Sequence, residues 1–168
     1  FFENNQSLSA LGVAGCNFGA GCARRIALAL RSCSKSLKSI GFTFNQLGDE
    51  QSAGIIEALV MRPQLESLGL QSMNIGRSEC SALGSLLRCT FTDLRFLNLN
   101  RNRIDDEGVD ALVGALMDGL TICTLGSLHL SLNPNITARG CQRLASLLEY
   151  PNSNLEYLHL FGNHVGDE

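Results

Sequence analysis

The feature of this sequence that most constrains its fold is an internal repeat with a period of about 29 residues. A leucine opens each unit, and the spacing between successive opening leucines stays within one or two positions of this period. These opening positions are Leu8, Leu37, Leu65, Leu94, Leu125 and Leu155. Six units that align over several apolar columns are not an accident of leucine content, so one structural unit recurs along the chain.

The unit from Leu94 to Leu116 shows the repeat most clearly, because two hydrophobic periods follow one another in it. Leu97 and Leu99 alternate with their neighbours, which predicts a half-buried strand at about 96–100. After Ile104 the apolar residues recur every three or four positions, which predicts an amphipathic helix. Acids near the start of a helix are favoured by its dipole. Three acids stand there: Asp105, Asp106 and Glu107.

The same columns recur in the other units. The central strand column is Leu11, Ile40, Leu68, Leu97, Leu128 and Leu158. The turn column is Cys16, Asn45, Met73, Asn102, Asn133 and Asn163. We expect each turn asparagine to bond the backbone of its own turn and of the neighbouring turn. Met73 has no amide, so a weaker link is expected there. The residues predicted to cap helix N-termini are Asp49, Ser78 and Thr137.

The motif L-x-x-L-x-L-x-x-N-x-I, followed by a helix and repeated at this spacing, resembles the leucine-rich repeat of the ribonuclease-inhibitor type. The resemblance covers the chain from Leu8 onward. It implies an α/β fold, a right-handed βα solenoid that forms a horseshoe segment. Strands pack about 4.8 Å apart and helices about 10 Å apart, so such a stack curves with parallel strands on the concave face and helices on the convex face.

We expect residues 1–168 to form a single repeat array with units starting near 8, 37, 65, 94, 125 and 155. The last unit lacks its helix after Val165. A solenoid normally closes with capping units, and neither end shows one, so we expect a fragment with further repeats of the parent chain at both ends.

Composition narrows the classes of partner and the compartment. The net charge is −3, which disfavours nucleic acid and an anionic membrane surface as partners. An odd number of cysteines without a C-x-x-C pair predicts buried free thiols, rather than a zinc site, in a reducing compartment. Because no signal peptide is visible either, a cytoplasmic location is expected. The cysteines are Cys16, Cys22, Cys33, Cys80, Cys89, Cys123 and Cys141.

The sequence contains no recognisable catalytic set, so we expect a protein that is not an enzyme and needs no metal or cofactor. His129 and His159 occupy the same strand column one repeat apart, which places their side chains side by side. Two exposed histidines on a binding face are favoured over a metal pair, because a metal site needs further ligands.

The candidate binding site is the concave face, which the residues between and after the strand leucines build. Its N-terminal half carries small side chains, whereas its C-terminal half carries the aromatic, arginine and asparagine residues that are typical of binding hot spots. The candidate partner-binding residues are Phe96, Asn98, Asn100, Arg101, His129, Ser131, Tyr157, His159 and Phe161.

The sequence therefore predicts a protein–protein interaction module that binds a partner on its concave face. The resemblance leaves two alternatives open. One is a regulator of a small GTPase that is similar to the activators of Ran. The other is a ligand-sensing repeat segment of a nucleotide-binding immune-type receptor, which a Walker A motif upstream in the reading frame would indicate.

Overall fold

The computed structural model of the chain describes residues 7–17, 19–32, 36–45, 47, 49–60, 64–88, 93–118 and 124–166. Short strands alternate with helices throughout. The strands are β1 (Ala10–Gly12), β2 (Ser39–Gly41), β3 (Ser67–Gly69), β4 (Phe96–Asn98), β5 (Ser127–His129) and β6 (Tyr157–His159). The helices are α1 (Ala20–Ser32), α2 (Asp49–Val60), α3 (Arg77–Leu87), α4 (Asp106–Leu116) and α5 (Ala138–Leu148).

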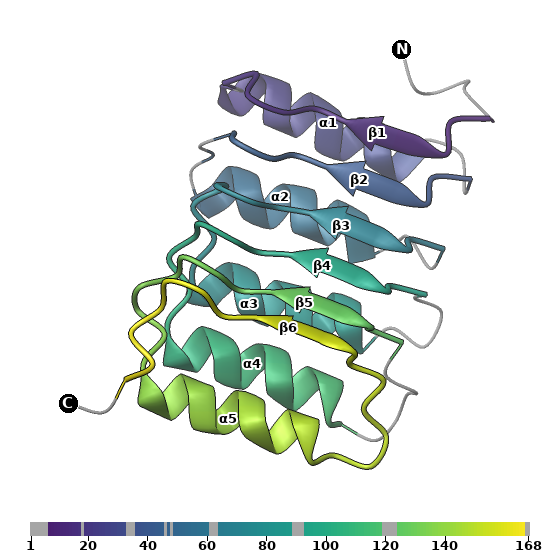
Figure 1. Ribbon diagram of the computed structural model, residues 1–168. Helices are drawn as coiled ribbons and strands as arrows, with labels where there is room; N and C mark the ends of the chain where they lie inside the picture. The colour runs from purple at the N-terminus through teal and green to yellow at the C-terminus, as the bar shows by residue number, and fades with distance from the viewer. Residues whose placement is uncertain are drawn as a thin grey trace.

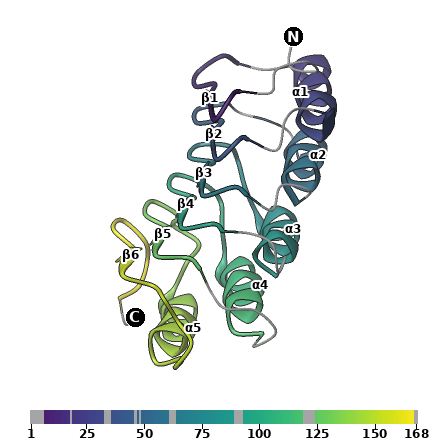
Figure 2. The same cartoon turned by 90° about the vertical axis from the view of Figure 1, so that its right-hand side faces the viewer.

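The six strands form one parallel sheet in sequence order, β1-β2-β3-β4-β5-β6. Figure 1 shows the strands stacked in one layer with the helices behind them, and Figure 2 shows an arc whose inner side is the strand layer. The predicted βα solenoid is confirmed, because every strand pairs in parallel with its neighbours and, within the described ranges, no strand closes the sheet into a barrel.

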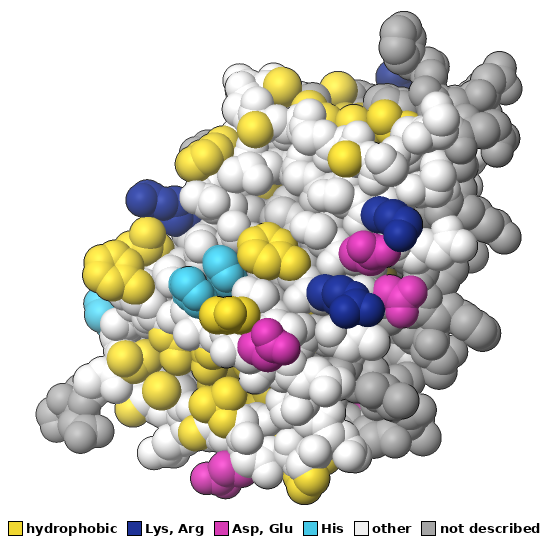
Figure 3. Space-filling view, turned by 45° about the vertical axis from the view of Figure 1, so that its right-hand side comes forward, with side chains coloured by type: hydrophobic (Ala, Val, Ile, Leu, Met, Phe, Trp, Pro, Cys, Tyr) yellow, Lys and Arg dark blue, Asp and Glu magenta, His cyan; other side chains and the backbone are white. Residues whose placement is uncertain are grey.

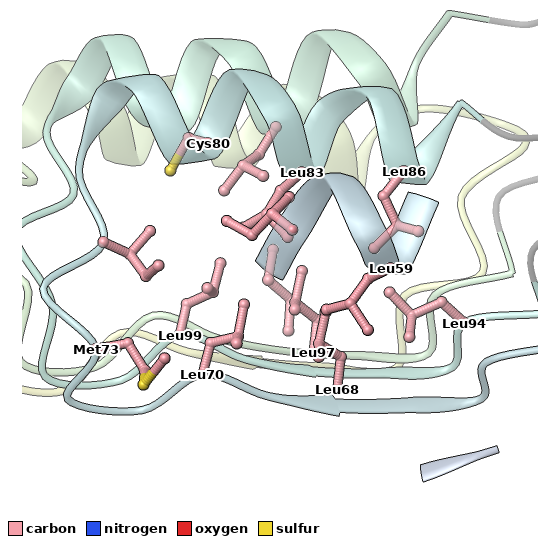
Figure 4. Packing of buried hydrophobic residues seen from close by; sticks show 14 of the residues in the cluster. Leu59, Leu68, Leu70, Met73, Cys80, Leu83, Leu86, Leu94, Leu97 and Leu99 are labelled. Carbon is pink, nitrogen blue, oxygen red and sulfur yellow. The ribbon is translucent and has the colours of Figure 1, made fainter. Parts of the chain in front are cut away.

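The strand register reproduces the sequence columns. Leu97 pairs with Leu68 on one side and with Leu128 on the other. Each of these central strand residues is at most 1% exposed. Figure 4 shows leucines of the strand layer pointing toward Leu83 and Leu86 of α3, so the core fills the space between the two layers. Burying a leucine side chain contributes about 1.5–3 kcal/mol, so this repeated column is a main source of stability.

The turn asparagines form the expected ladder of hydrogen bonds. The Asn102 amide nitrogen donates to the carbonyl oxygens of Leu70 and Leu99, both at 2.9 Å. Its amide oxygen accepts from the backbone N–H groups of Met73 at 2.9 Å and Ile75 at 3.0 Å. One buried side chain therefore satisfies backbone groups of two adjacent repeats.

The expected weakness at Met73 is confirmed by the hydrogen bonds on either side of it. Met73 is 1% exposed and packs into the core with a thioether instead of an amide. The Leu99 carbonyl accepts hydrogen bonds from the side-chain amides of both Asn102 and Asn133. The Leu70 carbonyl accepts a side-chain amide bond from Asn102 alone. The third repeat thus lacks its own rung, and Asn102 supports it from the next repeat.

A second turn column, immediately before the asparagine column, has a left-handed backbone. Its residues have φ between 56° and 72° in every repeat, although only two of the six are glycine. In the first five repeats their N–H groups donate to a backbone carbonyl of the next repeat, as Phe44 does to Gln71 at 2.9 Å. The column is Gly15, Phe44, Ser72, Arg101, Leu132 and Gly162. The four residues of this column that are not glycine thus have a backbone conformation that L-residues disfavour.

The helix starts confirm one predicted N-cap and correct two. Thr137 caps α5, and its hydroxyl accepts from the Arg139 N–H at 3.3 Å. The prediction for Ser78 is wrong, because α3 begins at Arg77 after Gly76, whose N–H bonds the Glu79 carboxylate instead. Asp49 is the first residue of α2 rather than its cap. A reciprocal bond from a later acid can therefore replace a capping hydroxyl.

Candidate functional site

The concave face is built by the two outward residues of each strand. In β4 these are Phe96 and Asn98, which are half-buried, while Leu97 between them points into the core. The alternation follows from the pleat of a strand, whose successive side chains point to opposite faces. Small side chains occupy the same positions in β2 and β3, so side chains of substantial size project from this face mainly in β4, β5 and β6.

Three aromatic rings form a row across β4, β5 and β6. The Phe96 and His129 rings meet edge to face, with centroids 4.9 Å apart and an interplanar angle of 67°. The His129 and His159 rings are stacked, with centroids 4.1 Å apart and an angle of 14°. The parallel register sets the histidine stack, because it places His129 directly beside His159. Phe96 pairs with Ser127, so its ring reaches His129 diagonally across the two strands. The predicted side-by-side placement of the two histidines is confirmed.

His129 differs from the expectation that both histidines are exposed. It is half-buried, and its Nε2 lies 3.0 Å from the Ser127 hydroxyl, whereas His159 is exposed. Burial lowers the pKa of His129, and the neighbouring His159 lowers it further. The row therefore holds a neutral, hydrogen-bonded ring at its centre at physiological pH.

Two exposed aromatic side chains flank the row. Tyr157 is 60% exposed and Phe161 is 80% exposed. Figure 3 shows two adjacent histidine side chains with hydrophobic side chains close by, while most charged groups lie nearer one edge of the face. This C-terminal part of the sheet thus presents a ring-rich surface to solvent.

Asn98 and Asn100 use their side-chain oxygens within the protein. The Asn98 oxygen accepts from the Asn100 N–H at 3.0 Å, and the Asn100 oxygen accepts from the Ser131 N–H at 2.7 Å. Arg101 is exposed, and its own N–H donates to the Ser131 carbonyl at 2.9 Å. These residues therefore shape the carboxyl edge of the sheet as well as lining it.

Ser131 is buried, although the sequence placed it among the residues of the binding surface. Its exposed fraction is 8%, and its backbone groups are bonded by Asn100 and Arg101. The position lies past the end of β5, where the chain turns into the left-handed residue Leu132. Ser131 therefore supports the shape of the site and offers little surface for contact.

Phe44 is a candidate contact that sequence reasoning missed. It is 54% exposed and belongs to the left-handed turn column of the second repeat. A hydrophobic pattern does not reveal a bulky residue at positive φ, because glycine or asparagine usually occupies a left-handed turn position. The signal that could have found it is its place in the repeat, since Phe44 directly precedes the turn residue Asn45 just as Arg101 directly precedes Asn102.

Charged and polar side chains form a network at the starts of α3, α4 and α5. Arg77 of α3 bonds Asp105 and Glu107, each at 2.8 Å. Asp106 of α4 accepts from the Thr137 N–H at 2.9 Å and from the Thr137 hydroxyl at 2.7 Å. Burial raises the pKa of Asp106, but these bonds and one from Gly140 outweigh it, so the pKa is lowered. These acids link neighbouring repeats.

The cysteines have mixed environments. Cys80 is buried, and burial raises the pKa of its thiol far above the ordinary value. Cys16 and Cys22 are free but exposed, which corrects the expectation of buried thiols for these two. Cys33, Cys89 and Cys123 lie outside the described residues.

Neither a metal-binding cluster nor a membrane-spanning helix occurs in the part of the chain that the structure describes. Within those ranges no group of three or more histidine, cysteine or acidic side chains is placed to hold a metal ion. Among the helices of the same ranges, none is long and apolar enough to cross a membrane.

Comparison with known proteins agrees with the repeat architecture. A family model described as "Leucine Rich repeat" matches residues 92–113, 121–145 and 152–168. Ribonuclease inhibitor of Sus scrofa is 36% identical over 134 residues, which is 79% of this chain and 28% of that protein. NACHT, LRR and PYD domains-containing protein 5 of Bos taurus is 34% identical over 137 residues, or 80% of this chain and 12% of that protein.

A third relative, Tonsoku-like protein of Bos taurus, is 29% identical over 162 residues, which is 92% of this chain and 11% of that protein. The chain thus spans less than a third of the length of each of these relatives. The matched repeats, the parallel βα stack and the similarity to ribonuclease inhibitor point the same way: this chain is a leucine-rich-repeat protein that resembles the ribonuclease-inhibitor type.

Proposed function

We propose that this chain is a protein-interaction module that binds its partner on the concave face, with β4, β5 and β6 as the main contact region. The observation that carries the proposal is the row of Phe96, His129 and His159 rings, flanked by the exposed Tyr157 and Phe161. A single exposed aromatic is ordinary, but a cluster on adjacent strands is typical of an interface hot spot. The leucine-rich repeats and the similarity to ribonuclease inhibitor support the interaction role.

The rigidity of the row favours binding as well. The rings sit on a parallel sheet, and His129 is held by the Ser127 hydroxyl and by both ring neighbours. Side chains that are already ordered lose less conformational entropy when a partner docks. A binding surface on strands is therefore preorganised, and the partner contacts need no large rearrangement.

The test is an affinity purification with a variant that carries Phe96→Ala, Tyr157→Ala and Phe161→Ala together. We expect proteins captured by the unaltered chain to be lost with this variant. The matched control carries Leu28→Ala and Leu148→Ala, which remove apolar side chains that are 59% and 56% exposed on helices. Partners should remain bound to the control. Equal capture by the triple variant and the unaltered chain would refute the proposal.

A second candidate function is that of a sensing segment within a larger receptor. The similarity to NACHT, LRR and PYD domains-containing protein 5 over 80% of this chain favours it. The measurement is the sequence of the longer reading frame around these residues. A Walker A motif upstream supports a receptor segment, whereas a frame built only of repeats excludes it.

A further inference from the structure

The carboxyl edge of the concave face carries two asparagine side chains whose oxygens are bonded within the protein and whose NH₂ groups are not. The oxygens of Asn98 and Asn100 accept backbone N–H groups, so an amide NH₂ remains on each. Among the described residues, neither NH₂ group has a hydrogen-bond partner, and neither is a buried unsatisfied atom. Both donors are therefore open to solvent at the ends of β4 and its following turn.

Arg101 adds a cation to the same edge. Its side chain is exposed and has no acidic partner in the part of the chain that the structure describes. Arginines at the helix starts differ, because Arg77 and Arg139 each bond two carboxylates. The guanidinium of Arg101 is thus available to bind a planar carboxylate in a bidentate manner.

Charges of both signs lie at the opposite, amino edge of the sheet. There Glu66 is paired with Lys38 at 2.6 Å, and Glu156 is exposed directly before Tyr157. The ring row lies between the two edges. The face therefore runs from an edge of mixed charge, through aromatic rings, to amide and guanidinium donors.

Resting on the proposed function, we infer that the partner presents a protein segment with an aspartate or glutamate at the carboxyl edge, beside Asn98, Asn100 and Arg101. The same segment carries an apolar side chain over the ring row. Charge and hydrogen-bond complementarity set this choice, because an acceptor without charge leaves Arg101 unneutralised on docking. The partner is thus acidic at one defined place rather than over its whole surface.

Single-stranded nucleic acid also combines acceptors with stacking groups, but this surface suits it poorly. A bound phosphate backbone needs several cations along its path, and Arg101 is the sole cation among the nine candidate contact residues. The chain as a whole carries a charge of −3. An acidic protein segment requires one cation and is the better match.

The experiment is a selection of random linear peptides on the 168-residue chain, followed by fluorescence anisotropy with the selected peptides. We expect enrichment of peptides that combine an acidic with an aromatic or aliphatic residue. Replacing the carboxylate by its amide is expected to weaken binding roughly tenfold, the effect of losing a charge-assisted pair. A poly-thymidine strand is measured in the same assay, as the probe for binding of single-stranded nucleic acid.

Two charge-reversal variants locate the effect. Arg101→Glu is expected to abolish the preference for the acidic peptide and to create a preference for a lysine-substituted version. The control is Arg24→Glu on α1, which changes the net charge equally and reverses a different exposed arginine. It should leave the affinity unchanged, so a similar loss in both variants would show a general charge effect and overturn the inference.

The outcomes separate the inference from the proposed function. Selected peptides that bind the Phe96, Tyr157 and Phe161 alanine variant as well as the unaltered chain contradict concave-face binding itself. Peptides that require those rings but carry no acid, or that bind equally as amides, overturn only the acidic-partner inference. Tighter binding of poly-thymidine than of every selected peptide also overturns it, as does a selection that enriches no peptide.

Discussion

Asn102 and Asn133 are the same residue at the same turn position, yet their removal should have unequal effects on stability. Both are buried, with exposed fractions of 5% and 0%. Substitution by alanine deletes the same atoms in each case. The difference arises from Met73, which interrupts the ladder one repeat before Asn102.

The magnitude follows from counting the backbone groups that lose their side-chain partner. In Asn102→Ala these are the N–H groups of Met73 and Ile75 and the carbonyl of Leu70. The Leu99 carbonyl keeps a bond from Asn133 at 3.0 Å. A buried group left unsatisfied costs about 1–3 kcal/mol, so three such groups, partly relaxed, lower the unfolding free energy by about 3–5 kcal/mol.

Asn133→Ala leaves fewer groups unsatisfied. The Leu99 carbonyl keeps its bond from Asn102, and the Leu130 carbonyl keeps one from Asn163 at 3.0 Å. Only the Ile104 N–H loses its side-chain acceptor. The expected loss is therefore about 1–3 kcal/mol, clearly less than for Asn102→Ala.

Urea unfolding followed by circular dichroism measures both variants. The slope of free energy against urea must be compared first, because repeat arrays can unfold in parts. Asn102→Met is a useful third variant, since it reproduces the natural occupant of the third repeat and restores side-chain volume. Equal losses for Asn102→Ala and Asn133→Ala, or a larger loss for Asn133→Ala, would refute the account of the ladder.

Three further predictions concern the core, the acid network and the left-handed column. Leu97→Ala should lower the unfolding free energy by about 2–5 kcal/mol, whereas Leu148→Ala should change it by less than about 0.5 kcal/mol in the same urea titration. The lowered pKa of Asp106 means that its bonds to Thr137 stabilise the fold above the carboxyl's unfolded pKa and are lost as pH falls through the folded pKa. Asp106→Asn should therefore be destabilising near neutral pH, and its stability gap to the unaltered chain should narrow steadily as pH falls below the ordinary carboxyl pKa of 3.8. A gap that stays constant from neutral pH into acid contradicts this. Phe44→Gly should raise the unfolding free energy by about 1 kcal/mol, because it relieves a φ of 59° and removes an exposed side chain; a loss of stability would show that Phe44 packs usefully.

The fold could be predicted from the sequence because its determinants are local and repeated. The strand column through Leu97 and the turn column through Asn102 each recur once in every repeat, and parallel pairing places the members of a column side by side. The stacking of His129 on His159 follows from the same register. Residues that lie one repeat apart in the sequence are therefore in contact on adjacent strands.

What could not be predicted depends on the backbone conformation of the turns. The burial of Ser131 and the positive φ of Leu132 come from how the chain leaves β5, which a hydrophobic pattern does not encode. The cap that Asp106 provides for α5 was hidden for another reason. Its partner Thr137 lies in the next repeat, and acids at a helix start are usually assigned to their own helix.

The paired turn columns also determine where this chain can change in length. In every unit the turn position lies at the same distance from the opening leucine, as Asn102 does from Leu94, although the full units differ in length. The extra residue of the fifth unit falls after Asn133, in the turn at 134–135. A one-residue insertion after Asn133 should therefore be accommodated, whereas one between Leu94 and Asn102 shifts the left-handed residue and the asparagine out of line with both neighbouring repeats. New binding loops can accordingly be added to this scaffold beyond the asparagines without disturbing the sheet.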